Sequence, residues 1–233
     1  MLLQRQYMDV SWEAVFNPGG ATDFFKHGMP GPIETREDRF SPTNAWWLSE
    51  LSRLVYRRGE EEPGITPSGP RRQDFLARVG LEERAFFNAG GVQAAFITRT
   101  RDDMPAVGIL VFRGTTGTWR NWQSNLSLWW SSWPRGGRVH SGFKRQFMAL
   151  WPAIACTVTA WHAPLLYTGH SLGGAKCAYF ASKSKRRDLA GLALLSAIPA
   201  IWAIMNASTP SAEPVNSKLS IMASTCASNS ALR

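Results

Sequence analysis

The sequence contains little cysteine, with three such residues among 233. Cys156, Cys177 and Cys226 are an odd number at spacings that match no zinc or CxxC pattern, so we expect neither a disulfide framework nor a metal site. Reduced thiols are typical of the cytosol. Residues 1–16 also lack the uninterrupted apolar run of a secretory signal, because Arg5 and Asp9 interrupt it. We therefore expect a cytoplasmic location.

Acidic residues are scarce as well, 17 against 26 lysines and arginines, which gives a formal net charge of +9. Such an excess favours anionic lipid surfaces or nucleic acid as partners. The basic residues are spread along the chain, with short clusters at 71–72 and 183–187, and form no long stripe with interleaved aromatics. We expect no nucleic-acid partner, although a basic protein that binds membrane surfaces or nucleic acid is kept as an alternative function.

The amino-terminal third has a helical pattern. Apolar residues recur at three- and four-residue steps over residues 44–56, which predicts an amphipathic helix. Residues 57–72 are dense in Glu, Pro and Gly and predict a loop. A second short helix is expected near residues 75–79.

After residue 90 the pattern alternates between strands and helices. Residues 94–100 and 107–112 are rich in β-formers and predict an antiparallel hairpin. Helices are expected over residues 142–154 and 172–182, with a short buried strand over 165–168 between them. This alternation predicts an α/β sandwich around a largely parallel sheet.

The strand at 165–168 runs into Gly169-His170-Ser171-Leu172-Gly173-Gly174 and then into a helix. A sharp strand-to-helix turn holds a serine hydroxyl exposed beside a base, which a serine needs in order to act as a nucleophile. Gly169 and Gly173 remove Cβ atoms that would clash in such a turn, and Gly174 lets the helix pack closely. The N–H of Leu172 faces the oxygen that becomes negative during acyl transfer. The motif predicts Ser171 as a nucleophile; the alternative is a glycine-rich turn without chemistry.

Three further motifs precede this turn: Val-Phe-Arg-Gly-Thr at 111–115, Trp-Arg-Asn-Trp at 119–122 and Val-His-Ser-Gly-Phe at 139–143. In this order, over roughly residues 94–181, the chain resembles the class 3 lipases. The resemblance implies an α/β-hydrolase-like sandwich that hydrolyses carboxylic esters of lipids such as acylglycerols. Nucleophilic ester hydrolysis needs no cofactor, so none is expected.

The resemblance also assigns roles around Ser171. Thr115 would supply the second oxyanion-hole donor, opposite Leu172. His140 would be a structural residue near the site, because it precedes the serine, whereas the order in α/β-hydrolases is nucleophile, acid, histidine. The other residues expected to support the site are Arg113, Gly114 and His170.

An aromatic segment at 125–134 contains Trp129, Trp130 and Trp133. In the family this region can hold a lid, and exposed tryptophans would make transient contact with a lipid surface. The alternative is that these tryptophans are buried under the edge of the sheet.

No histidine follows Ser171 in the 233 residues, and Asp188 and Glu213 are the only acidic residues there. The resemblance implies a FGxPRxG block followed by the acid and the histidine, yet residues 192–205 are an apolar run. We therefore expect impaired activity. The alternatives are a catalytically inactive lipase-like fragment or a lipid-binding pseudoenzyme.

The apolar run has three interpretations: a short membrane span interrupted by Pro199, a buried strand and helix, or a change of reading frame from about Gly191. In a shifted frame, a codon consists of the third base of one original codon and the first two bases of the next. Trp202 followed by Ala203 then gives glycine, and Met205 followed by Asn206 gives glutamate. The same shift permits the missing FGxPRxG block. The expected organisation is a helical, loop-rich extension over residues 1–90, an α/β-hydrolase core over 91–190, and an atypical segment over 191–233, frame-shifted or disordered. The fold would then be incomplete at the carboxyl terminus.

Overall fold

The computed structural model describes residues 18–26, 29–35, 41–60, 69–99, 103–114, 130–132, 138–170, 172–184 and 189–194. The helices of this part are η1 (Pro18–Gly20), α2 (Pro42–Leu54), α3 (Arg72–Arg78), α5 (Ser141–Ala160) and α6 (Leu172–Lys183). The strands are β1 (Leu81–Ala89), β2 (Val92–Arg99), β3 (Gly108–Phe112), β4 (Trp130–Ser132), β5 (Arg138–His140), β6 (Leu165–His170) and β7 (Leu189–Leu194).

Five strands form one mixed sheet in the order β1-β2-β3-β6-β7. The pairs β1/β2 and β2/β3 are antiparallel, and the pairs β3/β6 and β6/β7 are parallel. The predicted hairpin over residues 94–112 is confirmed, and the parallel part of the sheet consists of β3, β6 and β7. Strands β4 and β5 form a separate antiparallel pair.

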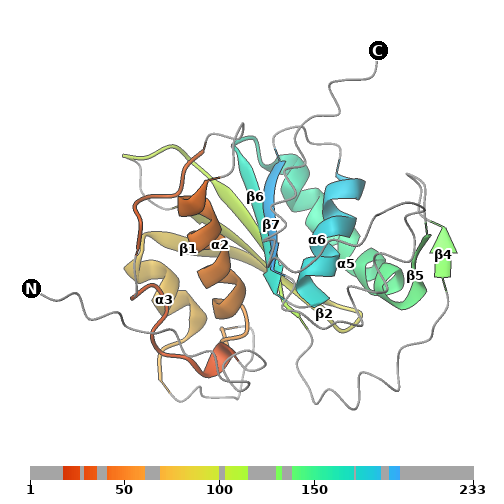
Figure 1. Cartoon of the computed structure of the whole chain (residues 1–233), viewed down its shortest axis with the longest axis horizontal. Helices are drawn as coiled ribbons and strands as arrows, with labels where there is room; N and C mark the ends of the chain where they lie inside the picture. The colour runs from red at the N-terminus through yellow and green to blue at the C-terminus, as the bar shows by residue number, and fades with distance from the viewer. Residues whose placement is uncertain are drawn as a thin grey trace, which may run out of the picture.

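Helices cover both faces of the sheet, with α2 and α3 on one side and α5 and α6 on the other (Figure 1). Successive residues of β3 therefore enter different cores: Ile109 and Val111 face α2 and α3, whereas Leu110 and Phe112 face α5 and α6. All five residues of β3 are buried, as expected for a strand that is covered on both faces. The predicted α/β sandwich is confirmed.

Helix α2 begins where the sequence provides an N-cap serine and a proline whose fixed φ suits the first helical position. The Ser41 hydroxyl accepts a hydrogen bond of 3.0 Å from the backbone N–H of Asn44, and Pro42 occupies the first helical position. Trp47, Leu51 and other apolar side chains on one stripe are buried. The helix predicted over 44–56 is thus confirmed, as are the short helix near 75–79, the helices near 142–154 and 172–182, and the strand near 165–168.

Strand β1 was not anticipated from the sequence. Its segment Leu-Glu-Glu-Arg-Ala-Phe-Phe-Asn-Ala carries adjacent charges and lies at the edge of the sheet, where one side of the backbone stays open to solvent. Gly90 and Gly91, with φ of 61° and 76°, form the tight turn that joins it to β2. Residues 90 and 91 are therefore the turn of a hairpin, and β1 belongs to the same sheet as β2.

Strand β7 passes through Gly191 and pairs with β6 from Leu189 to Leu194. Residues 190 and 191 therefore belong to the same strand. Residues 195–205 of the apolar run lie outside the described residues. Within the described ranges, no helix is long and apolar enough to cross a membrane.

Candidate active site

The predicted elbow lies at the carboxyl edge of the parallel strands. Strand β6 ends at His170, and α6 begins at Leu172. Ser171 itself lies outside the described residues. The chain therefore changes from a central strand to a helix between His170 and Leu172, which is the local arrangement that a nucleophile elbow requires.

The glycines around this turn leave no room for a Cβ atom. A Cβ built on Gly169 would lie 2.5 Å from the carbonyl carbon of Gly173. A Cβ built on Gly173 would overlap the carbonyl oxygen of Phe112. The start of α6 is therefore packed directly against the backbones of β6 and β3. Gly174 is buried on the same helix.

The end of β3 lies beside the elbow. In the parallel ladder Phe112 pairs with Gly169, so Arg113 and Gly114 leave the sheet next to His170. A Cβ built on Gly114 would lie 2.8 Å from the carbonyl oxygen of His170. Thr115, the predicted second oxyanion donor, follows Gly114 in the chain and lies outside the described residues.

Arg113 ties the end of β3 to its surroundings. Its backbone N–H donates to the Gln93 carbonyl at 2.9 Å, and its guanidinium donates to the Gln93 side-chain oxygen at 2.8 Å. The guanidinium also donates to the Tyr56 carbonyl at 3.4 Å and lies over the Tyr56 ring, 5.6 Å from its centroid. The Arg113 side chain thus ties the end of β3 to Gln93 and to Tyr56, the residue shortly after α2.

Tyr56, which was not singled out from the sequence, reaches the elbow from the segment after α2. Its hydroxyl lies 3.1 Å from Nδ1 of His170, so the two groups share a hydrogen bond, and a Cβ built on Gly114 would overlap this hydroxyl. A tyrosine shortly after an amphipathic helix was the sequence signal for this contact.

Burial determines the charge states of the groups around the elbow. Burial lowers the pKa of His170 to about 4, so the imidazole is neutral at pH 7. Burial raises the pKa of Tyr56 far above its ordinary value, so its hydroxyl stays protonated. The Lys176 amine of α6 is buried near the same strand end, and burial lowers its pKa to about 8. His170 and Tyr56 therefore act as neutral hydrogen-bonding groups here.

The remaining predicted site residues are only partly placed. His140 ends β5, pairs with Trp130 of β4 and directly precedes α5. Trp129 and Trp133 lie outside the described residues. Among the described residues, no group of three or more His, Cys, Asp and Glu side chains is arranged to hold a metal ion.

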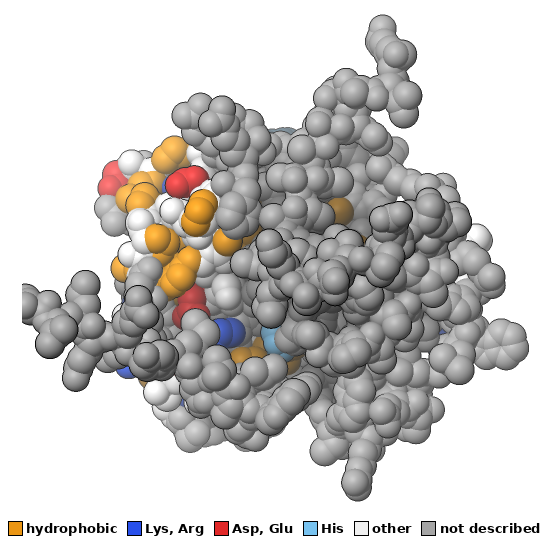
Figure 2. All heavy atoms as spheres, viewed as in Figure 1, with side chains coloured by type: hydrophobic (Ala, Val, Ile, Leu, Met, Phe, Trp, Pro, Cys, Tyr) orange, Lys and Arg blue, Asp and Glu red, His pale blue; other side chains and the backbone are white. Residues whose placement is uncertain are grey.

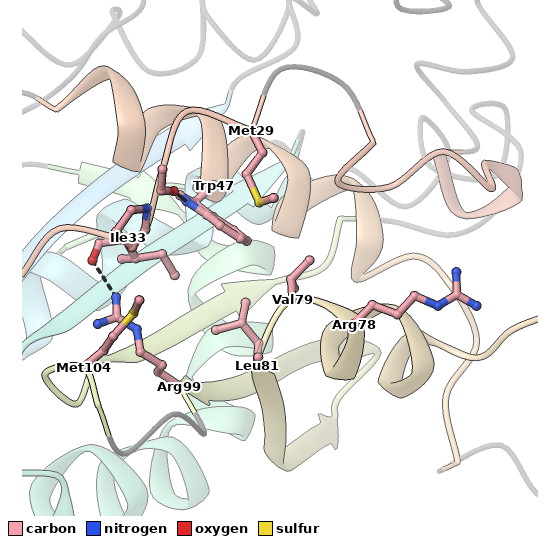
Figure 3. Close-up of a pocket in the computed structure, with 11 residues that line it drawn as sticks. Met29, Ile33, Trp47, Arg78, Val79, Leu81, Arg99 and Met104 are labelled. Atoms are coloured by element: carbon pink, nitrogen blue, oxygen red, sulfur yellow. Dashed lines mark hydrogen bonds between the residues drawn. The ribbon is translucent and has the colours of Figure 1, made fainter.

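A separate pocket of about 390 Å³ opens on the α2 side, where hydrophobic side chains gather at the surface (Figure 2). Trp47, Ile33 and Leu81 line it, and Arg99 beside it donates to the Ile33 carbonyl (Figure 3). Arg99 follows Thr98, which pairs with Gly108 at the start of β3. The pocket therefore lies at the amino edge of the parallel strands, opposite the elbow, and is not its acyl pocket.

Comparison with known proteins gives one family match. The family model described as "Lipase (class 3)" matches residues 109–199. No curated protein sequence matches the chain at a significant level. The match continues past Gly191, where the frame hypothesis placed the change.

Several solved structures of fungal lipases are similar in fold. The native propeptide complex of the Rhizomucor miehei lipase is 20% identical over 74% of this chain and 63% of its own, with a TM-score of 0.48. A nonglycosylated lipase of Yarrowia lipolytica is 16% identical over 68% and 60%, with a TM-score of 0.47. The lipase of Rhizopus microsporus var. chinensis is 20% identical over 56% and 49%, with a TM-score of 0.41.

The chain covers 41%, 49% and 53% of the first three lipase structures that it matches, or about half their length. The family match covers β3, α5, β6, α6 and β7, the elements that surround the elbow. It also covers the motifs at 111–115, 119–122 and 139–143 from which the resemblance was inferred. Residues 109–199 therefore match the class 3 lipase family, in agreement with the resemblance inferred from the motifs.

Proposed function

We propose that this chain is a serine hydrolase for carboxylic esters of lipids, such as acylglycerols, with Ser171 as its nucleophile. The observation that carries the proposal is the pairing of Phe112 with Gly169. This register brings the segment before Thr115 and the segment before Ser171 out of the sheet side by side. A nucleophile and a backbone donor from two neighbouring strands are what acyl transfer requires.

The reaction would proceed in two steps. The Ser171 oxygen attacks the ester carbonyl and passes its proton to a base, while the backbone N–H groups of Leu172 and Thr115 stabilise the negative oxygen. The alcohol leaves with a proton, and an acyl group stays on Ser171 until water releases it as a carboxylic acid. The neutral imidazole of His170 is bonded to Tyr56 through Nδ1, so we assign it a supporting role.

The mechanism requires a general base that accepts the Ser171 proton. No histidine follows Ser171 among the 233 residues. Removal of a triad member leaves residual catalysis that is lower by several orders of magnitude. We therefore propose slow turnover, and the alternative is a lipase-like protein that binds lipid without hydrolysing it.

The lipid-surface contact through Trp129, Trp130 and Trp133 stays a prediction. Trp130 begins β4, which pairs with β5 just before α5. Binding of the protein to lipid vesicles, compared with a variant in which all three tryptophans are replaced by serine, would test it. Equal binding of both proteins would contradict the contact.

Hydrolysis of a short-chain nitrophenyl ester and of a triacylglycerol emulsion, together with labelling by a fluorophosphonate, tests the proposed function. Ser171→Ala should abolish turnover and labelling, because the reacting oxygen is removed. Ser182→Ala, a serine on the same helix whose hydroxyl donates to the Tyr179 carbonyl, is the matched control and should retain both. Turnover that survives in Ser171→Ala would contradict Ser171 as nucleophile. Absence of turnover and labelling in the unmodified chain would contradict the hydrolase itself.

A further inference from the structure

A lysine side chain is buried inside the site region, where the family motif does not assign it a role. Lys176 lies on the second turn of α6 and is 1% exposed. Its amine donates a hydrogen bond of 3.1 Å to the backbone carbonyl of Arg113. The contact joins the elbow helix to the residue that follows β3.

This placement is costly for a cation. Burial disfavours the charged amine, and the amino-terminal half of a helix carries a positive partial charge that repels it. Its pKa is lowered to about 8, mainly by burial. A lysine that keeps its amine in such surroundings is expected to make a contact that an apolar side chain could not make.

The contact is made at the point where strand pairing ends. Phe112 with Gly169 is the last pair of the ladder between β3 and β6, and Arg113 is the next residue. Beyond this pair β3 has no further partner in β6, and Arg113 is held by a backbone bond on the β2 side and a side-chain bond from α6. The backbone carbonyl of Gln93 accepts from the Arg113 N–H, and the Lys176 amine donates to the Arg113 carbonyl.

We propose that Lys176 is a positioning residue that fixes the Arg113–Gly114 backbone, and through it the oxyanion donor that follows at Thr115. This inference rests on the proposed hydrolase function. The carbonyl of Arg113 belongs to the peptide unit that enters Gly114, so anchoring it limits rotation of the backbone just before Thr115. Because the donor acts on an oxygen that becomes negative only in the transition state, its displacement lowers kcat more than it changes KM.

The test compares Lys176→Met, Lys176→Gln and Lys183→Met in the full chain. Methionine keeps much of the side-chain volume without the donor, and glutamine keeps an N–H donor on a side chain one atom shorter. Lys183→Met is the matched control, because this lysine lies on the same helix and its amine lies over the Trp151 ring instead. Initial rates with a nitrophenyl ester give kcat and KM, and hydrogen exchange followed by mass spectrometry reports on the Gly114 amide.

We expect Lys176→Met to lower kcat by roughly 10- to 100-fold with little change in KM, because a small displacement of a reacting group has effects of this size. Lys176→Gln should recover part of the loss, and Lys183→Met should keep the kcat of the unmodified chain. Gly114 should exchange faster in Lys176→Met. Unchanged kcat in Lys176→Met, in a chain that does turn over, would overturn the proposal and leave the hydrolase function standing.

If the unmodified chain neither turns over nor reacts with fluorophosphonate, the hydrolase function fails, and hydrogen exchange then decides the backbone contact separately. Faster exchange at Gly114 in Lys176→Met would support the anchoring of this backbone in an inactive fold. Unchanged exchange would overturn it. A thermal unfolding scan of each variant identifies any loss of the fold, in which case the comparison is made with Lys176→Gln.

Discussion

Replacing Gly173 with alanine should destabilise the fold although alanine is the better helix former. A Cβ on Gly173 would overlap the carbonyl oxygen of Phe112 and would lie 3.0 Å from its carbonyl carbon and 3.3 Å from that of Arg113. All three atoms belong to the backbone of a buried strand end, so no flexible side chain can move aside. The helix must shift away from β3 to admit the methyl group.

The magnitude follows from two opposing effects. Overpacking that forces a backbone shift costs about 3 kcal/mol at the upper end of its usual range. Alanine returns about 1 kcal/mol relative to glycine inside a helix. The net loss in the free energy of unfolding is therefore about 2 kcal/mol, which for a chain of this size lowers Tm by roughly 4–8 °C. The same shift lengthens the bond between Lys176 and Arg113, so activity should fall as well.

Urea unfolding followed by tryptophan fluorescence measures this loss. Gly20→Ala is the control, because a Cβ on Gly20 has no atom within 4 Å. It should leave the free energy of unfolding unchanged or raise it by about 0.5 kcal/mol through the unfolded state. If Gly173→Ala is as stable as the unmodified chain, α6 is not packed against the backbone of β3, and the proposed geometry of the elbow is wrong.

Three other changes test neighbouring contacts. Tyr56→Phe removes the hydroxyl that bonds to His170 at 3.1 Å and should cost about 1 kcal/mol in urea unfolding; an unchanged midpoint would argue against this bond. Phe180→Ala empties a fully buried site between the rings of Phe112 and Tyr167 and should cost about 3–5 kcal/mol by the same measurement, far more than a change at an exposed position. The folded pKa of Lys176 is lowered from 10.5 to about 8, so the unfolded chain binds the proton more tightly between these values. Its contribution to stability is therefore fully present above pH 10.5 and is lost as the pH falls through 8. From pH 7.5 to pH 10 the unmodified chain should gain on the order of 2 kcal/mol relative to Lys176→Met, and parallel pH profiles of the two proteins would refute the burial of this amine.

The elements that the sequence predicted are those with a local pattern. The apolar stripe from residue 44 to 56, the β-rich runs on both sides of residues 101–105 and the glycines at 169 and 173 each carry their signal within a few residues. Strand β1 carried a weaker local signal in its sequence. Its Glu82, Glu83 and Arg84 resemble a solvated loop when viewed alone, and only pairing with β2 explains them. The Gly90-Gly91 turn was the available hairpin signal.

The bonds of β1 also explain why its charges are tolerated. The Glu83 carboxylate pairs with the guanidinium of Arg72, which is fully buried and lies 4.5 Å from the Phe86 ring centroid. The Arg72 guanidinium also donates to the Arg57 carbonyl at 2.8 Å. A charged run that joins a helix, a loop and an edge strand in this way cannot be distinguished from a solvated run by composition, because the partners are distant in the sequence.

The two side-chain contacts at the candidate site both join residues that are far apart in the sequence. Tyr56 and His170 are 114 positions apart, and Lys176 and Arg113 are 63 positions apart, so no local window contains either pair. Lys176 nevertheless had a sequence signal. Leu172, Gly173, Tyr179 and Phe180, which stand three and four positions before and after it, are residues typical of a buried helical face, and all four are buried. A lysine in the middle of such a face cannot reach water along its own helix, so the sequence alone indicates that its amine must find an acceptor inside the protein.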